Sequence, residues 1–158
     1  MDPYFLAKWL HILSSTVLFG TGIGTAFQMV NAMADGRPAV VHGVARGVVR
    51  ADWLFTTPAG VIQPATGLWL VLITGHDLTA PWLVLTYAAY ALAFACWAPV
   101  VHLQIRIRDL AGQAAAEGRA LPLRARRLYH IWFALGWPAF GALVGVFWLM
   151  IAKPDFGW

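Results

Sequence analysis

Hydrophobic residues along this chain gather into four long runs, separated by one short polar turn and by two stretches that hold most of the charge. A helix needs roughly 20 mostly apolar residues to cross about 30 Å of hydrocarbon, and each run is long enough. Backbone groups in hydrocarbon must hydrogen bond within their own segment, so each run should be helical. The pattern predicts an all-α integral membrane protein, one up-down four-helix bundle over residues 1–158 with spans at residues 4–30, 53–74, 82–104 and 131–152.

The basic residues predict how this bundle is oriented. Nine arginines lie between the first and second spans or between the third and fourth, and only Lys8 and Lys153 lie elsewhere. Because positively charged loops stay in the cytoplasm, both termini and the turn at His76 should lie outside. We expect the second helix to begin near Pro38, and the third helix to continue through Glu117 and stop at Gly118.

The overall composition agrees with a lipid environment. Hydrophobic residues make up 60% of the chain and charged residues 11%, whereas a soluble domain has about 25% charged residues. The net charge of +4 is confined to the two loop stretches, so nucleic-acid binding is not expected. The single cysteine, Cys96, excludes a disulfide within the chain and a cysteine-based zinc cluster.

The first span carries a polar stripe of Lys8, His11 and Ser15, whose spacing places them on one helix face. Lys8 is near the outer boundary, where its ammonium group can reach water. His11 lies about 10 Å below the start of the helix. Two interpretations stay open: a hydrogen bond to a neighbouring helix, or ligation of heme iron, for which histidine is a standard ligand.

The second span carries another stripe, Thr56, Gly60, Gln63 and Gly67. Gln63 directly precedes Pro64, so it can satisfy backbone groups freed by the proline kink or contact a bound cofactor. None of the four expected spans contains a carboxylate, so a carboxylate-based proton or cation pump is not expected.

The remaining histidines are weaker metal-ligand candidates. His102 and His130 lie near the cytoplasmic ends of their spans, some 20 Å in depth from His11, so they cannot share an iron with it. His76, in the outer turn, is closer in level and could serve as a second ligand. The aromatic run Trp132, Phe133, Trp137 and Phe140 is typical of lipid-facing or core positions rather than of a cofactor site.

Several short segments resemble those of the HemJ-type protoporphyrinogen oxidases. Residues 7–12 (AKWLHI) resemble the opening of that family's first helix. The chain looks closer still to an uncharacterised bacterial integral-membrane family of the same superfamily, which also includes copper-resistance proteins. The other similar segments are residues 57–59 (TPA), 67–70 (GLWL), 82–83 (WL), 106–110 (RIRDL) and 152–156 (AKPDF).

This resemblance implies a b-type heme held by His11, in a protein that exchanges electrons with a quinone, a porphyrin or a redox partner protein. Thr86 stands where the HemJ-type enzymes have a lysine, and threonine is neither a cation nor a good heme ligand. Heme binding in a bacterial cytoplasmic membrane is therefore implied more directly than protoporphyrinogen oxidation. The alternative is a cofactor-free structural, assembly or solute-permeation subunit, and the small-residue stripes permit a homodimer.

Overall fold

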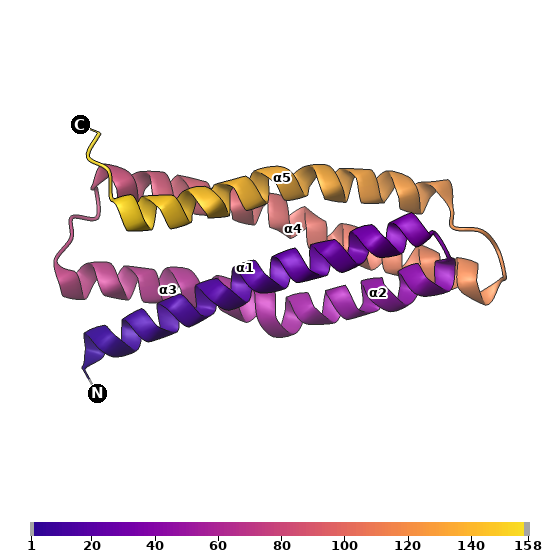
Figure 1. Ribbon diagram of the computed structural model, residues 1–158, viewed down its shortest axis with the longest axis horizontal. Helices are drawn as coiled ribbons and strands as arrows, with labels where there is room; N and C mark the ends of the chain where they lie inside the picture. The colour runs from indigo at the N-terminus through magenta and orange to yellow at the C-terminus, as the bar shows by residue number, and fades with distance from the viewer. Residues whose placement is uncertain (1, 157–158) are drawn as a thin grey trace.

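Four long helices lie roughly parallel in the computed structural model, which describes residues 2–156 (Figure 1). Four helical segments are long and apolar enough to cross a membrane, which confirms the predicted all-helical architecture. The second of them is one continuous rod, because two α-helices join through a single π-helical turn. The elements are α1 (Pro3–Asp35), α2 (Pro38–Ala51), η1 (Asp52–Thr56), α3 (Thr57–Thr74), α4 (Pro81–Ala116) and α5 (Leu123–Ala152).

Proline and glycine set the helix ends. Pro38 opens α2, at a position where the missing N–H has no helical partner to lose. Gly36, at φ 74°, ends α1, and Gly118, at φ 62°, follows the end of α4. The predictions that the second helix begins near Pro38 and that the third runs on to Glu117 are confirmed within one residue.

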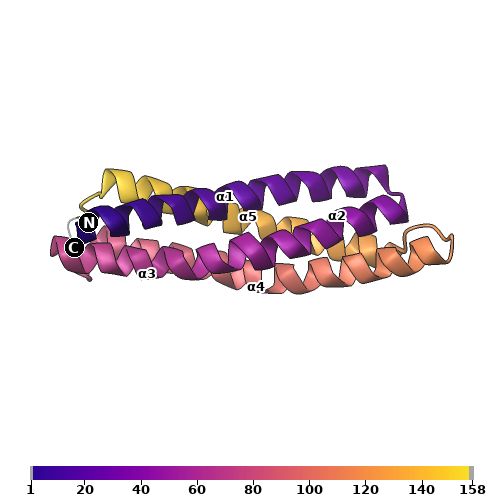
Figure 2. The same cartoon turned by 90° about the horizontal axis from the view of Figure 1, so that it is seen from below.

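The helices pack as two pairs that diverge toward one end of the bundle (Figures 1 and 2). α1 packs mainly against α2 and α3, whereas α5 packs against α4, and α2 joins the pairs by packing on α4. Both termini lie at the end that carries the α3–α4 turn, and the arginine-rich connections lie at the other end (Figure 1). The topology is up-down, as predicted.

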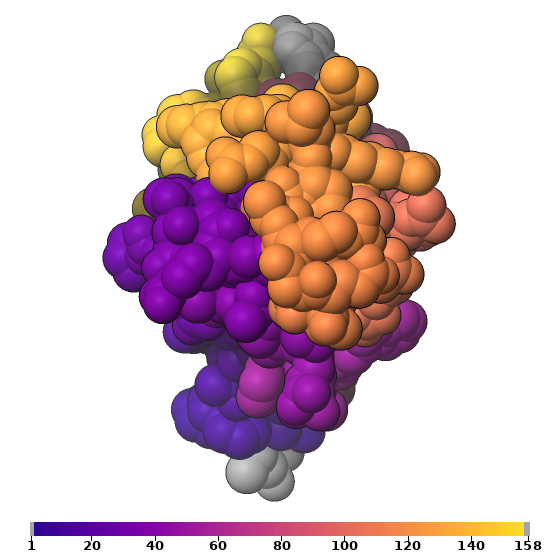
Figure 3. All heavy atoms as spheres, turned by 90° about the vertical axis from the view of Figure 1, so that its right-hand side faces the viewer, coloured from indigo at the N-terminus to yellow at the C-terminus, as the bar shows by residue number. Residues whose placement is uncertain are grey.

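The tightly packed core lies at the arginine-rich end, where the α1–α2 and α4–α5 connections touch (Figure 3). Met29, Val41, Ile107, Ala111 and Ala125 are all fully buried there. Elsewhere large apolar side chains point outward: 67% of Leu54 and 70% of Trp137 are exposed. Since such surface is favourable only in lipid, the hydrophobic exterior agrees with a bilayer environment.

The π-helical turn at Asp52–Thr56 ends two residues before Pro58. A proline ring clashes with the carbonyl four residues before it in a regular α-helix. The wider π turn gives that ring room while keeping the rod continuous, and such bulges are frequent at functional sites. The turn also directs Asp52 and Thr56 into the bundle, where both are buried.

The α3–α4 turn is organised by Asp77, which accepts hydrogen bonds from the backbone N–H of Thr79 at 2.8 Å and from its hydroxyl at 2.7 Å. These bonds hold the pKa of Asp77 below its ordinary value. The carboxylate form is therefore the one that stabilises the turn, and that contribution is lost as the pH falls through the lowered pKa.

Candidate functional site: a cavity between the helices

The structure brings His11 and Gln63 together in a cluster that joins α1 to α3. His11 Nδ1 lies 3.1 Å from the carbonyl oxygen of Gln63 and 3.0 Å from Thr66 Oγ1. Nε2 of Gln63 lies 3.1 Å from His11 Nε2. The hydroxyl of Ser14 donates to Gln63 Oε1.

These contacts assign every polar atom of the cluster a partner. The Thr66 hydroxyl donates to the Ile62 carbonyl at 2.7 Å, so its oxygen accepts from His11 Nδ1–H. The imidazole is then protonated on Nδ1, and its Nε2 lone pair accepts from the Gln63 amide. A fully paired network of this kind is what a buried histidine needs when it fastens two helices.

The arrangement around His11 does not fit an axial ligand of heme. The Nε2 lone pair, which iron would need, is already engaged by Gln63. A Cβ on Gly67 would lie 3.1 Å from His11 Cε1, so the ring is packed against the α3 backbone. His11 is also absent from the lining of the bundle's main cavity. Of the two interpretations of His11, the geometry favours the interhelical hydrogen bond.

The other predicted site residues on the helices do not join this cluster. Lys8 is exposed and lies 3.3 Å from the Tyr4 hydroxyl. The Ser15 hydroxyl donates to the Ile12 carbonyl of its own helix at 2.7 Å, and buried Thr86 donates in the same way to Trp82. Ser14, one position away from the predicted Ser15, is the α1 hydroxyl that meets Gln63.

The remaining histidines are dispersed. His76 Nε2 lies 3.1 Å from the Lys153 ammonium in the turn at the terminal end. His102 and His130 are exposed near the arginine-rich end, where His130 lies beside the Tyr129 ring. Across residues 2–156, no group of three or more His, Cys, Asp or Glu side chains could hold a metal ion.

Tyr90, rather than Gln63, compensates for the proline in α3. Pro64 has no backbone N–H, so the carbonyl of Gly60, four residues earlier, loses its helical partner. The hydroxyl of Tyr90 on α4 donates to that carbonyl at 2.5 Å. This bond ties α3 to α4, and it places Tyr90 at the wall of a cavity between the helices.

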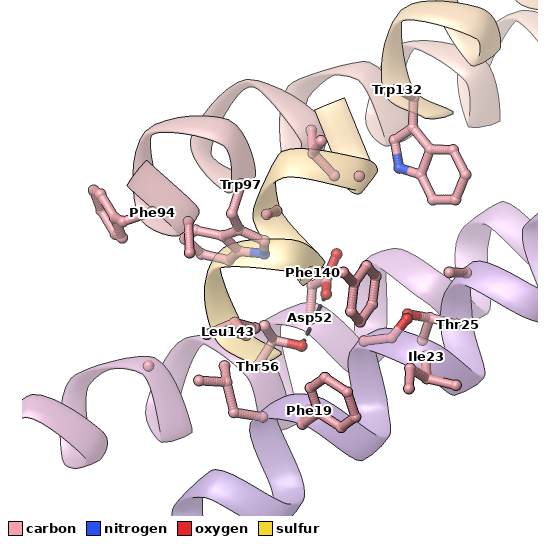
Figure 4. A pocket seen from close by; sticks show the side chains of 18 of the residues that line it. Phe19, Ile23, Thr25, Asp52, Thr56, Phe94, Trp97, Trp132, Phe140 and Leu143 are labelled. Atoms are coloured by element: carbon pink, nitrogen blue, oxygen red, sulfur yellow. Dashed lines mark hydrogen bonds between the residues drawn. The ribbon is translucent and has the colours of Figure 1, made fainter. Parts of the chain in front are cut away.

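This cavity, of about 530 Å³, lies where the two helix pairs diverge. α1, the α2–α3 rod, α4 and α5 all contribute to its walls, which are almost entirely apolar (Figure 4). Several lining side chains are also exposed on the outer surface, among them Ile23 and Val144 between α1 and α5, and Val61 and Phe94 between α3 and α4. The cavity therefore borders on the apolar exterior of the bundle.

A buried carboxyl group lies in the wall of this cavity. Asp52 is only 4% exposed and belongs to the spanning rod Pro38–Thr74. Asp52 directly precedes the expected span at residues 53–74, and it is buried because the second helix starts earlier than its apolar run. Thr56 donates a hydrogen bond of 2.9 Å to Asp52 Oδ1, and Gln104 on α4 lies beside the same carboxyl group.

Four polar atoms around the cavity have no hydrogen-bond partner, and they are the only such buried side-chain atoms in the described residues. They are Asp52 Oδ2, Gln104 Oε1, Trp97 Nε1 and Trp132 Nε1. Both indole nitrogens face the space around Asp52 and Phe140 (Figure 4). Because an unpaired buried polar group costs about 1–3 kcal/mol, four of them at one cavity indicate a binding site.

Sequence reasoning missed this site for an identifiable reason. Asp52 lies four residues before Thr56 and extends the stripe Thr56, Gly60, Gln63 and Gly67 by one turn, and this spacing could have revealed it. The aromatic residues of the run on α5 all contribute to the cavity lining, but Trp132 is buried whereas Phe133 and Trp137 are also exposed.

Comparison with known proteins supports membrane placement. A model of the family described as predicted integral membrane protein (DUF2269) matches residues 5–154. No curated protein and no solved structure matches the chain. The match shows no link to the HemJ-type enzymes.

Proposed function

Because the chain belongs to this family of predicted integral membrane proteins, we propose that it is a multi-pass membrane protein that binds a lipid-soluble molecule between its helices. The molecule's apolar body fills the cavity, and its polar head bonds the groups around Asp52. The observation that carries this proposal is the set of four unpartnered polar atoms in an otherwise apolar space.

The dimensions and access of the cavity support such a ligand. Small-molecule sites typically enclose about 300–1,000 Å³ and combine apolar walls with a few convergent polar groups, and this cavity holds about 530 Å³. Its openings lie between α1 and α5 and between α3 and α4, at side chains that face lipid. A ligand dissolved in the bilayer can enter through either opening without crossing water.

Two glycines on α5 provide a matched test of this function. A Cβ would meet nothing within 4 Å at either Gly136 or Gly141, but only Gly136 lines the cavity. Gly136→Leu should fill the space and weaken ligand binding at least tenfold, while Gly141→Leu should leave binding unchanged. The measurement is saturable binding of 4-decylphenol to the protein in lipid nanodiscs, above the uptake of empty nanodiscs.

Two outcomes would overturn the proposed function. One is an absence of saturable binding by the wild-type protein. The other is equal binding by the two leucine variants, since the probe would then lie outside the cavity. Decylbenzene, which has the same chain and no hydroxyl, should bind more weakly than 4-decylphenol, because it leaves the four polar atoms unpaired.

The orientation of the bundle belongs to the same proposal. The arginines between α1 and α2 and between α4 and α5 favour the cytoplasm of a bacterium for that end. In a Cys96→Ser background, Thr79→Cys in the α3–α4 turn should react with a membrane-impermeant maleimide added outside intact cells. Ala120→Cys, in the connection before α5, should react only after the cells are opened, and the reverse pattern would invert the topology.

A heme-dependent oxidoreductase related to the HemJ-type enzymes rests on the resemblance of short segments, and the contacts of His11 give it no support. A visible spectrum distinguishes the two functions. The proposed function requires no Soret band after expression with added heme. A band that disappears in His11→Ala would favour the heme function instead.

A further inference from the structure

The unpartnered atoms of the cavity include both donors and acceptors. The indole N–H groups of Trp97 and Trp132 can only donate, whereas Asp52 Oδ2 and Gln104 Oε1 are oxygens left without a donor. We infer that the ligand is a membrane quinol, which is a hydroxylated aromatic ring on an apolar chain, and this inference rests on the proposed function. The site prefers the quinol to the oxidised quinone.

The hydroxyl group is the chemistry that satisfies both halves of this set. A hydroxyl donates one hydrogen bond and accepts others, so it can donate to Asp52 Oδ2 or Gln104 Oε1 and accept from an indole N–H. A quinone carbonyl only accepts, and it would leave both oxygens unpaired. An ammonium only donates, and it would leave both indole N–H groups unpaired. A phosphate would have to leave water for a cavity whose walls are almost entirely apolar.

The walls of the cavity suit a flat ring. Phe19 packs edge-to-face with Phe140, with ring centroids 5.8 Å apart, and Trp97 and Trp132 lie across from them (Figure 4). Aromatic rings pack favourably against one another in edge-to-face and offset geometries. The ring's hydrocarbon chain then leaves through the openings between the helix pairs, where the exposed rim is apolar.

The depth of the polar groups in the membrane suits the polar head of a quinol. Asp52 lies about 33 Å below Thr74 along the rod, at about 1.5 Å per residue, so it is close to the arginine-side boundary of the hydrocarbon. The lining residues Leu18 on α1, Val61 on α3 and Tyr90 on α4 lie from there toward the end of the bundle that carries the α3–α4 turn. A ligand with its head at Asp52 therefore keeps its chain within the bilayer. Binding of this kind involves no electron transfer.

The test compares decylbenzoquinol with decylbenzoquinone, the same ring and chain in two oxidation states, bound anaerobically to the protein in nanodiscs. The wild-type protein should bind the quinol five- to tenfold more tightly. Asp52→Asn replaces the acceptor Oδ2 with an amide that can donate. It should weaken binding of the quinol and remove or invert the preference for the quinol over the quinone. Trp97→Phe removes one hydrogen-bond donor, and it should weaken binding of the quinol and of the quinone to a similar extent.

Each outcome bears on one claim. If the quinol and the quinone bind equally to the wild-type protein, and Gly136→Leu loses binding of both, the cavity binds lipid-soluble rings but the quinol assignment is wrong. A preference that persists unchanged in Asp52→Asn would also overturn the assignment. If Asp52→Asn does not fold, Gln104→Leu, which removes the second acceptor, should reduce the preference in the same direction. If Gly136→Leu binds both forms as the wild-type protein does, the proposed function itself fails.

Discussion

His11→Ala is expected to lower the free energy of unfolding by about 2–4 kcal/mol. The ring makes hydrogen bonds with Gln63 and Thr66, and its loss leaves the Gln63 amide unpaired. Interhelical hydrogen bonds in membranes contribute about 0.6 kcal/mol on average and up to about 1.7. The cavity left by an imidazole packed against Gly67 adds a further cost. Unfolding in detergent, followed by circular dichroism, measures the change.

Ser15→Ala is the control for this prediction on the same helix. The Ser15 hydroxyl bonds only the Ile12 carbonyl of its own helix, so its removal should change stability by no more than about 0.5 kcal/mol. If His11→Ala unfolds at the same midpoint as Ser15→Ala, the cluster does not fasten α1 to α3. Ser14→Ala should fall between the two, because Ser14 contributes one bond to Gln63.

Gly112→Ala and Gly47→Ala are expected to change stability in opposite directions. A Cβ on Gly112 would lie 2.7 Å from His42 Nδ1 and 2.9 Å from Cε1, and that ring is held by its bond of 3.0 Å to the Arg108 carbonyl. Overpacking costs about 1–3 kcal/mol, against a gain of up to about 1 kcal/mol in helix propensity. The net result at Gly112 is a loss of about 1–2 kcal/mol.

At Gly47, on α2, nothing lies within 4 Å of the added Cβ, so only the propensity gain remains. Comparison of the two variants in the same detergent gives the sign of each effect. A double-mutant cycle with His42→Ala tests whether the His42 ring causes this destabilisation. Removing the ring should make Gly112→Ala neutral or stabilising. Destabilisation by Gly112→Ala that persists without His42 would contradict the proposed contact.

Some of the candidate site follows from the sequence and some does not. His11 and Gln63 are both polar residues deep within apolar runs, so position alone singles them out as candidates. Their partnership required knowing that α1 packs on α3. Ser14 was missed in favour of Ser15 because they lie three and four residues after His11, on either side of it on the helix surface, and the rotation of the helix decides which one faces the neighbour.

The sequence by itself determined the four helices, their approximate ends and their placement in a membrane. These properties follow from local chemistry, because an apolar run of sufficient length has no water to satisfy its backbone and must form a helix that crosses the bilayer. Only the tertiary structure decided that the helix pairs diverge, that Asp52 is buried by α4, and that Trp97 and Trp132 meet it around one cavity. Those relations depend on how each helix is rotated and tilted against its neighbours, and the pattern along one helix does not specify that geometry.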